Sequence, residues 1–203
     1  MQFDRAKLKT VILYTCSKCN PSMLGAVKLH KVLYFSDMLH YAHVGVPITG
    51  STYRKMSFGP TCDQLLPVLR EMSAEGGIKI QEADYFGYAK KEYIPQRQPD
   101  SERLSNSERY LLDEIIEFVC RNNSAKTISD FSHNRAWELA EFGAVLPYNS
   151  VFQLFPSQVS PETMEWAATE VKNIEAQKRG NRTVGGTAFR DFRNRVLETI
   201  RGK

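Results

Sequence analysis

The chain has 203 residues, which matches one large domain and argues against two full ones. Hydrophobic residues make up 42% of the chain and the net charge at pH 7 is +4, so the composition is globular and excludes disorder throughout. No stretch approaches the roughly 18 apolar residues of a membrane-spanning helix, and the N-terminus lacks the pattern of a signal peptide. We therefore expect a cytoplasmic protein without a membrane segment.

The N-terminal part of the chain is predicted to contain two helices and a long loop. A first helix is expected from about Asp4 to Thr15. Ser22 is placed to cap a second helix that stops at Gly45, and this helix is the most hydrophobic one, so we expect it at the centre of the fold. Residues 46–60 are rich in Gly, Pro, Ser and Thr, which favours an ordered loop.

The middle of the chain mixes helix and strand signals. The segment after Gly59-Pro60 reads as an amphipathic helix that is either kinked at Pro67 or begins near it. β-branched and aromatic residues over 78–95 predict one antiparallel β-hairpin. Ser105 and Glu108 have the spacing of a capping box and mark the start of the next helix.

The C-terminal part is expected to be helical with one broken segment. A shorter helix is predicted over 131–142, and the proline-rich residues 144–161 are expected to wrap over the core. Another helix follows up to about Gln177, and a basic amphipathic helix is expected from Ala188 to Ile200. The predicted fold class is therefore mainly α (α+β), a compact helical domain over 1–143 with one small antiparallel β-hairpin, and a C-terminal extension, 144–203, packed on it.

The four cysteines are interpreted as free thiols, because the chain is expected in a reducing compartment. Cys16 and Cys19 form a CxxC pair, which is half of a zinc site. Cys62 and Cys120 stand alone in the sequence and do not complete a tetrahedral ligand set. We expect ordinary thiols near a helix end and no bound metal.

Other candidates for chemistry are weak. Asp37, His40 and His43 are spaced three apart on the second predicted helix and could converge as metal ligands, although such residues more often form a solvated helix edge. His133 is interpreted as a satisfied structural histidine that caps or braces the helix over 131–142. No common signature of a nucleotide-binding, hydrolase or zinc-protease site occurs. We expect no catalytic residues and no cofactor.

Positive charge gathers at the C-terminus. Residues 172–203 carry nine Lys and Arg against three Asp and Glu, a net charge of +6, so the rest of the chain sums to −2. Such an end suits a polyanion or an acidic protein face, and it equally suits a solvated terminal helix. Aromatic and basic residues also interleave over 53–58 and 189–193, where the aromatic side chains could instead anchor the core. The residues predicted to contact a partner are Tyr53, Phe58, Phe189, Arg190, Phe192, Arg193 and Val196.

Several motifs together resemble one known family. They are the run KLHKVLYFSD at 28–37, the turn GVPITG at 45–50, Tyr53, Phe58-Gly59-Pro60, Ser132-His133 and Trp137. This combination resembles the Panacea domain, which is also described as SocA-like and phage-associated, and the resemblance spans about Met23 to Phe142. Cys62 departs from the pattern, because an aliphatic residue is expected shortly after Pro60.

The resemblance implies a function that the residues alone do not indicate. It implies an antitoxin that neutralises a co-encoded toxin by direct binding, or an adaptor that delivers a toxin to a protease, and it supplies no catalytic residues. The alternative from another class is a nucleic-acid-binding regulator that uses the basic C-terminal helix. A metal-dependent enzyme is the third hypothesis. The sequence does not fix the oligomeric state.

Overall fold

The structure is a computed structural model of the whole chain, and it describes residues 2–85, 87–153, 162, 165–166 and 168–173. The chain divides into two compact units, Met1–Pro156 and Ser157–Lys203. In the second unit the described residues have helical backbone, within the range where a helix up to about Gln177 is predicted. The predicted basic helix from Ala188 to Ile200 lies outside the described residues.

The first unit is mainly helical with some β structure, as predicted, but it holds two β-hairpins rather than one. The strands are β1 (Tyr53–Met56) with β2 (Gly59–Cys62), and β3 (Ile78–Tyr85) with β4 (Tyr88–Pro95). The helices are α1 (Arg5–Lys18), α2 (Ala26–Val44), α3 (Leu65–Ala74), α4 (Asn106–Ile116), α5 (Ala125–Phe131) and α6 (Arg135–Leu139). Three short turns complete the unit: the 3-10 helices η1 (Ser101–Arg103) and η3 (Tyr148–Gln153), and the π-helical turn η2 (Glu117–Arg121).

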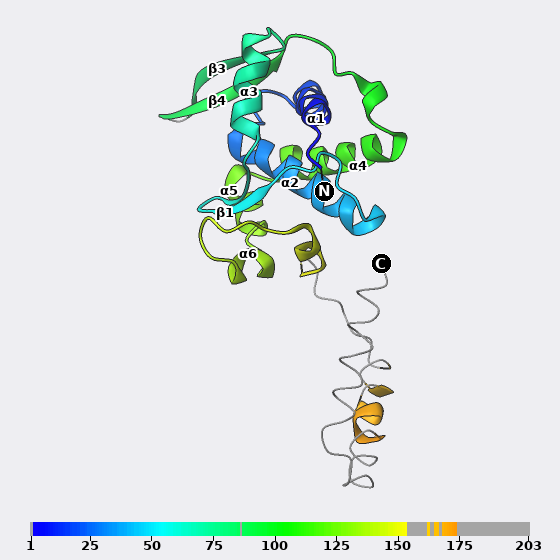
Figure 1. The fold of residues 1–203 in the computed structure, drawn as a ribbon. Coiled ribbons are helices and arrows are strands. Elements are labelled where there is room, and N and C mark those ends of the chain that lie inside the picture. Colours follow the sequence, from blue (N-terminus) through cyan, green and yellow to red (C-terminus); the bar gives the residue numbers. More distant parts are fainter. Residues whose placement is uncertain (1, 86, 154–161, 163–164, 167, 174–203) are drawn as a thin grey trace. The chain divides into compact units, whose positions relative to one another are not determined.

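α2 lies at the centre of the first unit, as its hydrophobicity predicts (Figure 1). It contacts α1, α4, α5, β2 and η3. Leu29 and Val32 are fully buried, and so are the polar side chains of Lys31 and Asp37 on the same helix. A helix that is buried on most of its faces must find partners for such polar groups inside the protein.

The helix starts follow local capping chemistry. Ser105 and Glu108 form the predicted capping box at the start of α4. The prediction that Ser22 caps α2 is wrong, because the N-cap is Gly25, with φ +84°. The backbone N–H and hydroxyl of Ser22 both bond to the side chain of Asn20, so this segment forms a separate turn before the helix.

The β3–β4 hairpin occurs where the sequence predicts it. Its register runs from Ile78 opposite Pro95 to Tyr85 opposite Tyr88. Ile78 and Tyr93 are buried, and the hairpin packs against α1 and α3. Figure 1 shows that its far end projects from the helical body.

The β1–β2 hairpin lies in the segment that was expected to be a loop. Its register places Tyr53 opposite Cys62. The other edge of β1 is also occupied, because the N–H of Leu146 donates to the Tyr53 carbonyl at 2.8 Å and the N–H of Lys55 donates to the Ala144 carbonyl at 3.0 Å. Partners that are 90 residues away along the chain stabilise these four-residue strands.

The helix predicted over 131–142 is also corrected by the structure. α5 ends at Phe131, and Asn134 begins α6 by accepting a hydrogen bond from the N–H of Trp137 at 3.2 Å. An asparagine N-cap inside the predicted range therefore divides it into two short helices. Pro67 causes no kink, because it occupies the first turn of α3, where its missing N–H costs little.

The segment after α6 returns to the body of the first unit. Leu146 and Val151 are buried, so the described residues 144–153 pack on the core as predicted for the start of the broken segment. The Tyr148 hydroxyl bonds to the Ser51 carbonyl. The division of the chain at residue 143 stays a prediction, although these residues fall within the first compact unit.

Candidate partner-binding site

A buried carboxylate organises the segment between α2 and β1. Asp37 is fully buried and accepts hydrogen bonds from the Thr49 N–H at 2.7 Å and the Thr49 hydroxyl at 2.5 Å. The Tyr53 hydroxyl lies 2.8 Å from the same carboxylate, and the Tyr148 hydroxyl lies 3.2 Å from it. Ser51 completes the network through its hydroxyl, 2.8 Å from that of Thr49. We call these five residues the Asp37 centre.

The electrostatics of the Asp37 centre indicate a structural role. Burial raises the pKa of Asp37, and the hydrogen bonds from Thr49, Tyr53 and Tyr148 oppose that shift. The pKa values of Tyr53 and Tyr148 are raised, first by burial and then by the nearby carboxylate. Both phenols therefore stay protonated and act as hydrogen-bond donors, which fixes η3 and β1 to α2.

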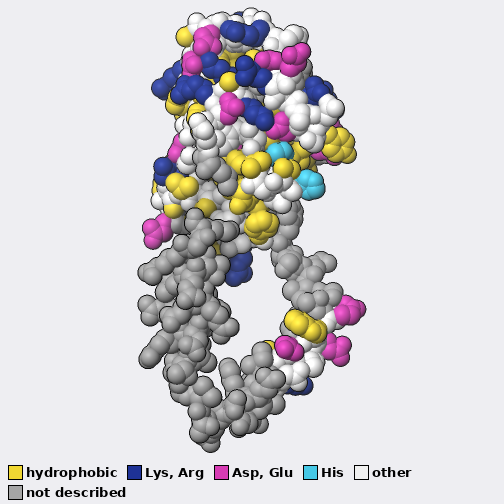
Figure 2. Space-filling model, turned by 45° about the vertical axis from the view of Figure 1, so that its right-hand side comes forward, with side chains coloured by type: hydrophobic (Ala, Val, Ile, Leu, Met, Phe, Trp, Pro, Cys, Tyr) yellow, Lys and Arg dark blue, Asp and Glu magenta, His cyan; other side chains and the backbone are white. Residues whose placement is uncertain are grey.

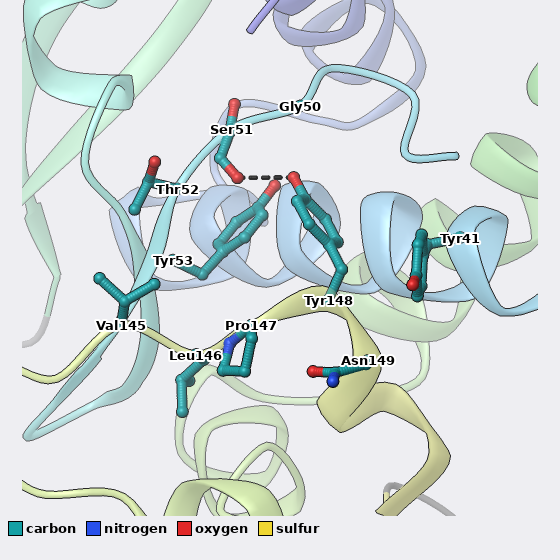
Figure 3. Close-up of a pocket in the computed structure, with 10 residues that line it drawn as sticks. All are labelled: Tyr41, Gly50, Ser51, Thr52, Tyr53, Val145, Leu146, Pro147, Tyr148 and Asn149. Atoms are coloured by element: carbon teal, nitrogen blue, oxygen red, sulfur yellow. Dashed lines mark hydrogen bonds between the residues drawn. The ribbon is translucent and has the colours of Figure 1, made fainter. Parts of the chain in front are cut away.

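A surface cavity of about 440 Å³ lies beside the Asp37 centre, and Figure 3 shows the residues that line it. The dashed line in that view marks the bond from the Tyr148 hydroxyl to the Ser51 carbonyl. The lining contains no carboxylate, imidazole, thiol or amine. Its residues are Tyr41, Gly50, Ser51, Thr52, Tyr53, Val145, Leu146, Pro147, Tyr148 and Asn149.

A second buried cluster brings together residues from three separate motifs. The Lys31 amine on α2 is 1% exposed and donates to the Pro60 carbonyl at 3.0 Å. Gly59 has φ +86°, and a Cβ there would stand 2.6 Å from the Lys31 amine and 2.3 Å from the Ser132 hydroxyl. His133 lies on the same side, with its Cδ2 3.2 Å from that position. We call these residues the Lys31 cluster.

The Lys31 cluster has reactive side chains in structural roles. Burial lowers the pKa of Lys31 to about 7. The Ser132 hydroxyl donates to the Ser129 carbonyl at 2.6 Å, which occupies its proton. The His133 ring stacks on Trp137 at 3.8 Å and so braces α6. The prediction that this histidine is satisfied is wrong at Nε2, which is buried and has no hydrogen-bond partner among the described residues.

The four cysteines are free and buried. Burial raises the pKa of Cys16 to about 12 and that of Cys62 to about 11. The pKa of Cys19 is lowered, because the Cys120 thiol donates a hydrogen bond to it. Two thiols that are 101 positions apart in the sequence are therefore neighbours, which their spacing could not indicate.

The three residues proposed as a weak metal set have separate surroundings. Asp37 belongs to the Asp37 centre, His40 Nδ1 lies 2.7 Å from the Val46 carbonyl, and His43 is exposed. Within the described ranges, no three His, Cys, Asp or Glu side chains are grouped as metal ligands. The expectation that no metal binds stays a prediction.

Exposed apolar side chains gather around the β1–β2 hairpin. The N–H of Gly143 donates to the Lys55 carbonyl at 2.9 Å, so the segment after α6 runs along β1. The β1–β2 hairpin, the end of α6 and the segment after it expose five large apolar side chains, which we call the hairpin patch: Met56 (37% exposed), Phe58 (69%), Leu139 (67%), Phe142 (68%) and Val145 (47%). Large apolar side chains that are exposed on adjoining segments are typical of a protein contact surface.

Charged and apolar side chains are unevenly distributed on the face in Figure 2. Lysine, arginine and acidic side chains crowd the upper part of the described domain, and yellow hydrophobic side chains gather in its lower part. The surface thus offers apolar areas that charged residues do not interrupt.

The structure separates the residues predicted to contact a partner. Phe58 lies exposed in the hairpin patch, whereas Tyr53 is 1% exposed and its hydroxyl faces Asp37. The remaining candidates lie outside the described residues; they are Phe189, Arg190, Phe192, Arg193 and Val196. Leu139, Phe142 and Val145 were missed, because no sequence signal distinguishes them from buried residues.

The chain belongs to the family described as "Antitoxin SocA-like, Panacea domain", whose model matches residues 29–138, more than half of the chain. The match runs from α2 to α6 and includes the Lys31 cluster and most of the Asp37 centre. No curated protein and no solved structure matches the chain. Among the described residues, no helix is long and apolar enough to cross a membrane.

Proposed function

We propose that the protein is a cytoplasmic, non-enzymatic antitoxin that neutralises a co-encoded toxin by binding it directly. The observation that carries the proposal is the match to the antitoxin family over the residues that build the domain. The Asp37 centre and the Lys31 cluster support it, because the Asp37 carboxylate, the Lys31 amine and the Ser132 hydroxyl are buried and hydrogen-bonded within the fold. The motif residues thus build a scaffold, and recognition is left to the surface.

The hairpin patch is the proposed contact surface for the toxin. Apolar and aromatic side chains that are exposed in the free protein and covered in a complex supply most of the binding energy at typical interfaces. Phe58, at the turn between β1 and β2, is the most exposed of the five. We propose a second contact through the stripe of Phe189, Phe192 and Val196 with its flanking Arg190 and Arg193.

The test is co-expression with the product of the adjacent gene, scored by growth. We expect Phe58→Asp to reduce protection at least tenfold in surviving cells, because a carboxylate placed in an apolar contact is left without a partner. Leu66→Asp is the matched control, because Leu66 is also an exposed apolar side chain (51%) but lies on α3. Equal protection by both variants would contradict the proposed surface.

The basic C-terminal segment supports a second candidate, a nucleic-acid-binding regulator. In the antitoxin proposal, Phe192→Ala weakens neutralisation more than joint replacement of Arg190 and Arg193 by Ala, because charges at the rim of an interface contribute little. A nucleic-acid binder shows the reverse order and an affinity that falls steeply with salt. If the protein is instead an adaptor for a protease, the toxin disappears from cells that co-express it.

A further inference from the structure

An apolar groove of about 380 Å³ lies between α2, α4, η2 and the end of α5. Its lining includes Phe35 and Leu39 from α2, and Leu111, Ile115 and Phe118 from α4 and η2. Phe131 closes the opposite side. We call it the α4 groove, and its side chains are distinct from those of the hairpin patch.

Aromatic side chains at the α4 groove remain open to solvent. The Phe131 ring lies 5.3 Å from the Phe118 ring and 5.8 Å from the Phe35 ring, measured between centroids. Phe131 is nevertheless 53% exposed and Phe118 is 38% exposed. Phe35 is 5% exposed, so the apolar surface that faces solvent here is that of Phe118 and Phe131, and a partner that covered these two rings would gain the free energy of their burial.

The dimensions of the α4 groove match a short helix. Leu111, Ile115 and Phe118 are spaced i, i+4 and i+7, so one wall extends over two helical turns, about 10 Å. Grooves between packed helices accept the side-chain ridge of a further helix, which inserts apolar residues at the same spacing. An extended peptide would place alternate side chains away from such a groove.

The carboxylate of Glu114 indicates the sign of the charge that the partner should carry. Glu114 also lines the groove and is exposed, and its carboxylate makes no ion pair or hydrogen bond with any other residue that the structure describes. No cationic side chain lines the groove. A Lys or Arg on the incoming helix would therefore meet a carboxylate that has no competing partner within the described ranges.

We propose that the α4 groove binds a short amphipathic helix of a partner protein, with apolar side chains at i, i+3 or i+4, and i+7 and a Lys or Arg opposite Glu114. This inference goes beyond the proposed function, because it concerns a different surface and defines its partner by chemistry. The proposed toxin contact at the hairpin patch and the proposed helix binding at the α4 groove can therefore be refuted independently of each other.

The test is fluorescence anisotropy with the full chain and two labelled peptides of 14 residues. Both carry leucines at i, i+4 and i+7; one carries lysines on the flank of that stripe and the other carries glutamates. We expect the lysine peptide to bind at least tenfold more tightly than the glutamate peptide. Glu114→Lys should weaken binding of the lysine peptide at least threefold and reverse or abolish the preference.

Three further variants make the result decisive. Glu82→Lys, on the exposed side of β3, changes the net charge equally and should leave binding unchanged. Phe131→Ser should weaken binding of the lysine peptide at least tenfold while its thermal midpoint shows that the fold is intact. Phe58→Asp in the hairpin patch should leave peptide binding as it is.

Specific outcomes would overturn the inference. They are no binding of the lysine peptide at 1 mM, or equal weakening by Glu114→Lys and Glu82→Lys. A dimer that Phe131→Ser dissociates would assign the groove to a second copy of the chain. Tighter peptide binding by Phe192→Ser would assign it to the chain's own C-terminal segment.

Discussion

Among the residues that the structure describes, no cation pairs with Asp37, and hydroxyl and amide donors hold its carboxylate instead. A buried charge of this kind is tolerated only when several donors point at it, so each donor contributes more than an ordinary hydrogen bond. Thr49 supplies two donors, and Tyr53 supplies a third from β1. Removal of any one donor should therefore lower the free energy of unfolding, because the buried carboxylate is then less well compensated.

Replacement of tyrosines in the core tests this account at single hydroxyls. Tyr53→Phe should lower the free energy of unfolding by roughly 1.5–3 kcal/mol, the usual range for a hydrogen bond to a charged group. Tyr34→Phe is the matched control, because the buried Tyr34 hydroxyl makes no hydrogen bond of ordinary geometry with any described residue. Urea denaturation measures both, and equal losses would contradict the role given to Asp37.

Lys31 is another buried ionisable group, and its burial predicts a pH dependence. Because burial lowers its pKa in the fold from 10.5 to about 7, the unfolded chain binds a proton between these values that the folded chain does not. The contribution of Lys31 to stability therefore rises as the pH rises from about 7 to 10.5, by up to about 1.4 kcal/mol per pH unit.

Lys31→Met removes this pH dependence. We expect the difference in unfolding free energy between the variant and the natural protein to shift in favour of the variant as the pH falls from 9 to 7. Other titrating groups, including the neighbouring His133, are common to both proteins and largely cancel. Denaturant unfolding at several pH values measures the difference, and a constant difference would mean that Lys31 stays charged in the fold.

At the scale of elements, the β1–β2 hairpin depends on one glycine. Gly59→Ala places a Cβ against the buried Lys31 amine and Ser132 hydroxyl, in addition to the strain of φ +86°. Gly76→Ala isolates the strain, because its φ is +66° but nothing lies within 4 Å of the added Cβ. We expect Gly59→Ala to cost roughly 1–3 kcal/mol more than the control, as overpacking does. Similar thermal midpoints for Gly59→Ala and Gly76→Ala would show that the side chains of the Lys31 cluster move aside for the added Cβ at little energetic cost.

Elements with a complete local signal were predictable from the sequence. The capping box at Ser105 and the β-branched run of the β3–β4 hairpin are determined by neighbouring residues. The β1–β2 hairpin was missed, because Gly59-Pro60 resembles a loop and the partners that stabilise β1, such as Ala144, lie far away in the sequence. The break between α5 and α6 had a local signal in Asn134 that the apolar periodicity concealed.

The sites were less predictable than the elements. Residues such as Lys31, Gly59 and Ser132 carry the family resemblance, but only the folded chain shows that they meet in one cluster. Exposure of Phe142 or Phe131 also depends on tertiary packing, because hydrophobic residues on a surface and in a core look alike in sequence. The proposed function rests on the family match, whereas the residue patterns alone indicate only the scaffold.

At the scale of the whole molecule, the first compact unit combines a hydrogen-bonded interior with exposed apolar surfaces that are proposed to bind other proteins. The carboxylate of the Asp37 centre and the Lys31 amine and Ser132 hydroxyl of the Lys31 cluster are held in hydrogen bonds within this interior. The hairpin patch is proposed to bind the toxin, and the α4 groove is proposed to bind a basic amphipathic helix. Both surfaces belong to the first compact unit.

Purification of the protein together with the product of the adjacent gene tests the central claim most directly. We expect that product to stop growth when it is expressed alone, to be harmless when this chain is co-expressed, and to elute with it as one complex in size-exclusion chromatography. Rescue of growth without a complex, or an adjacent gene product that is harmless by itself, would contradict neutralisation by direct binding.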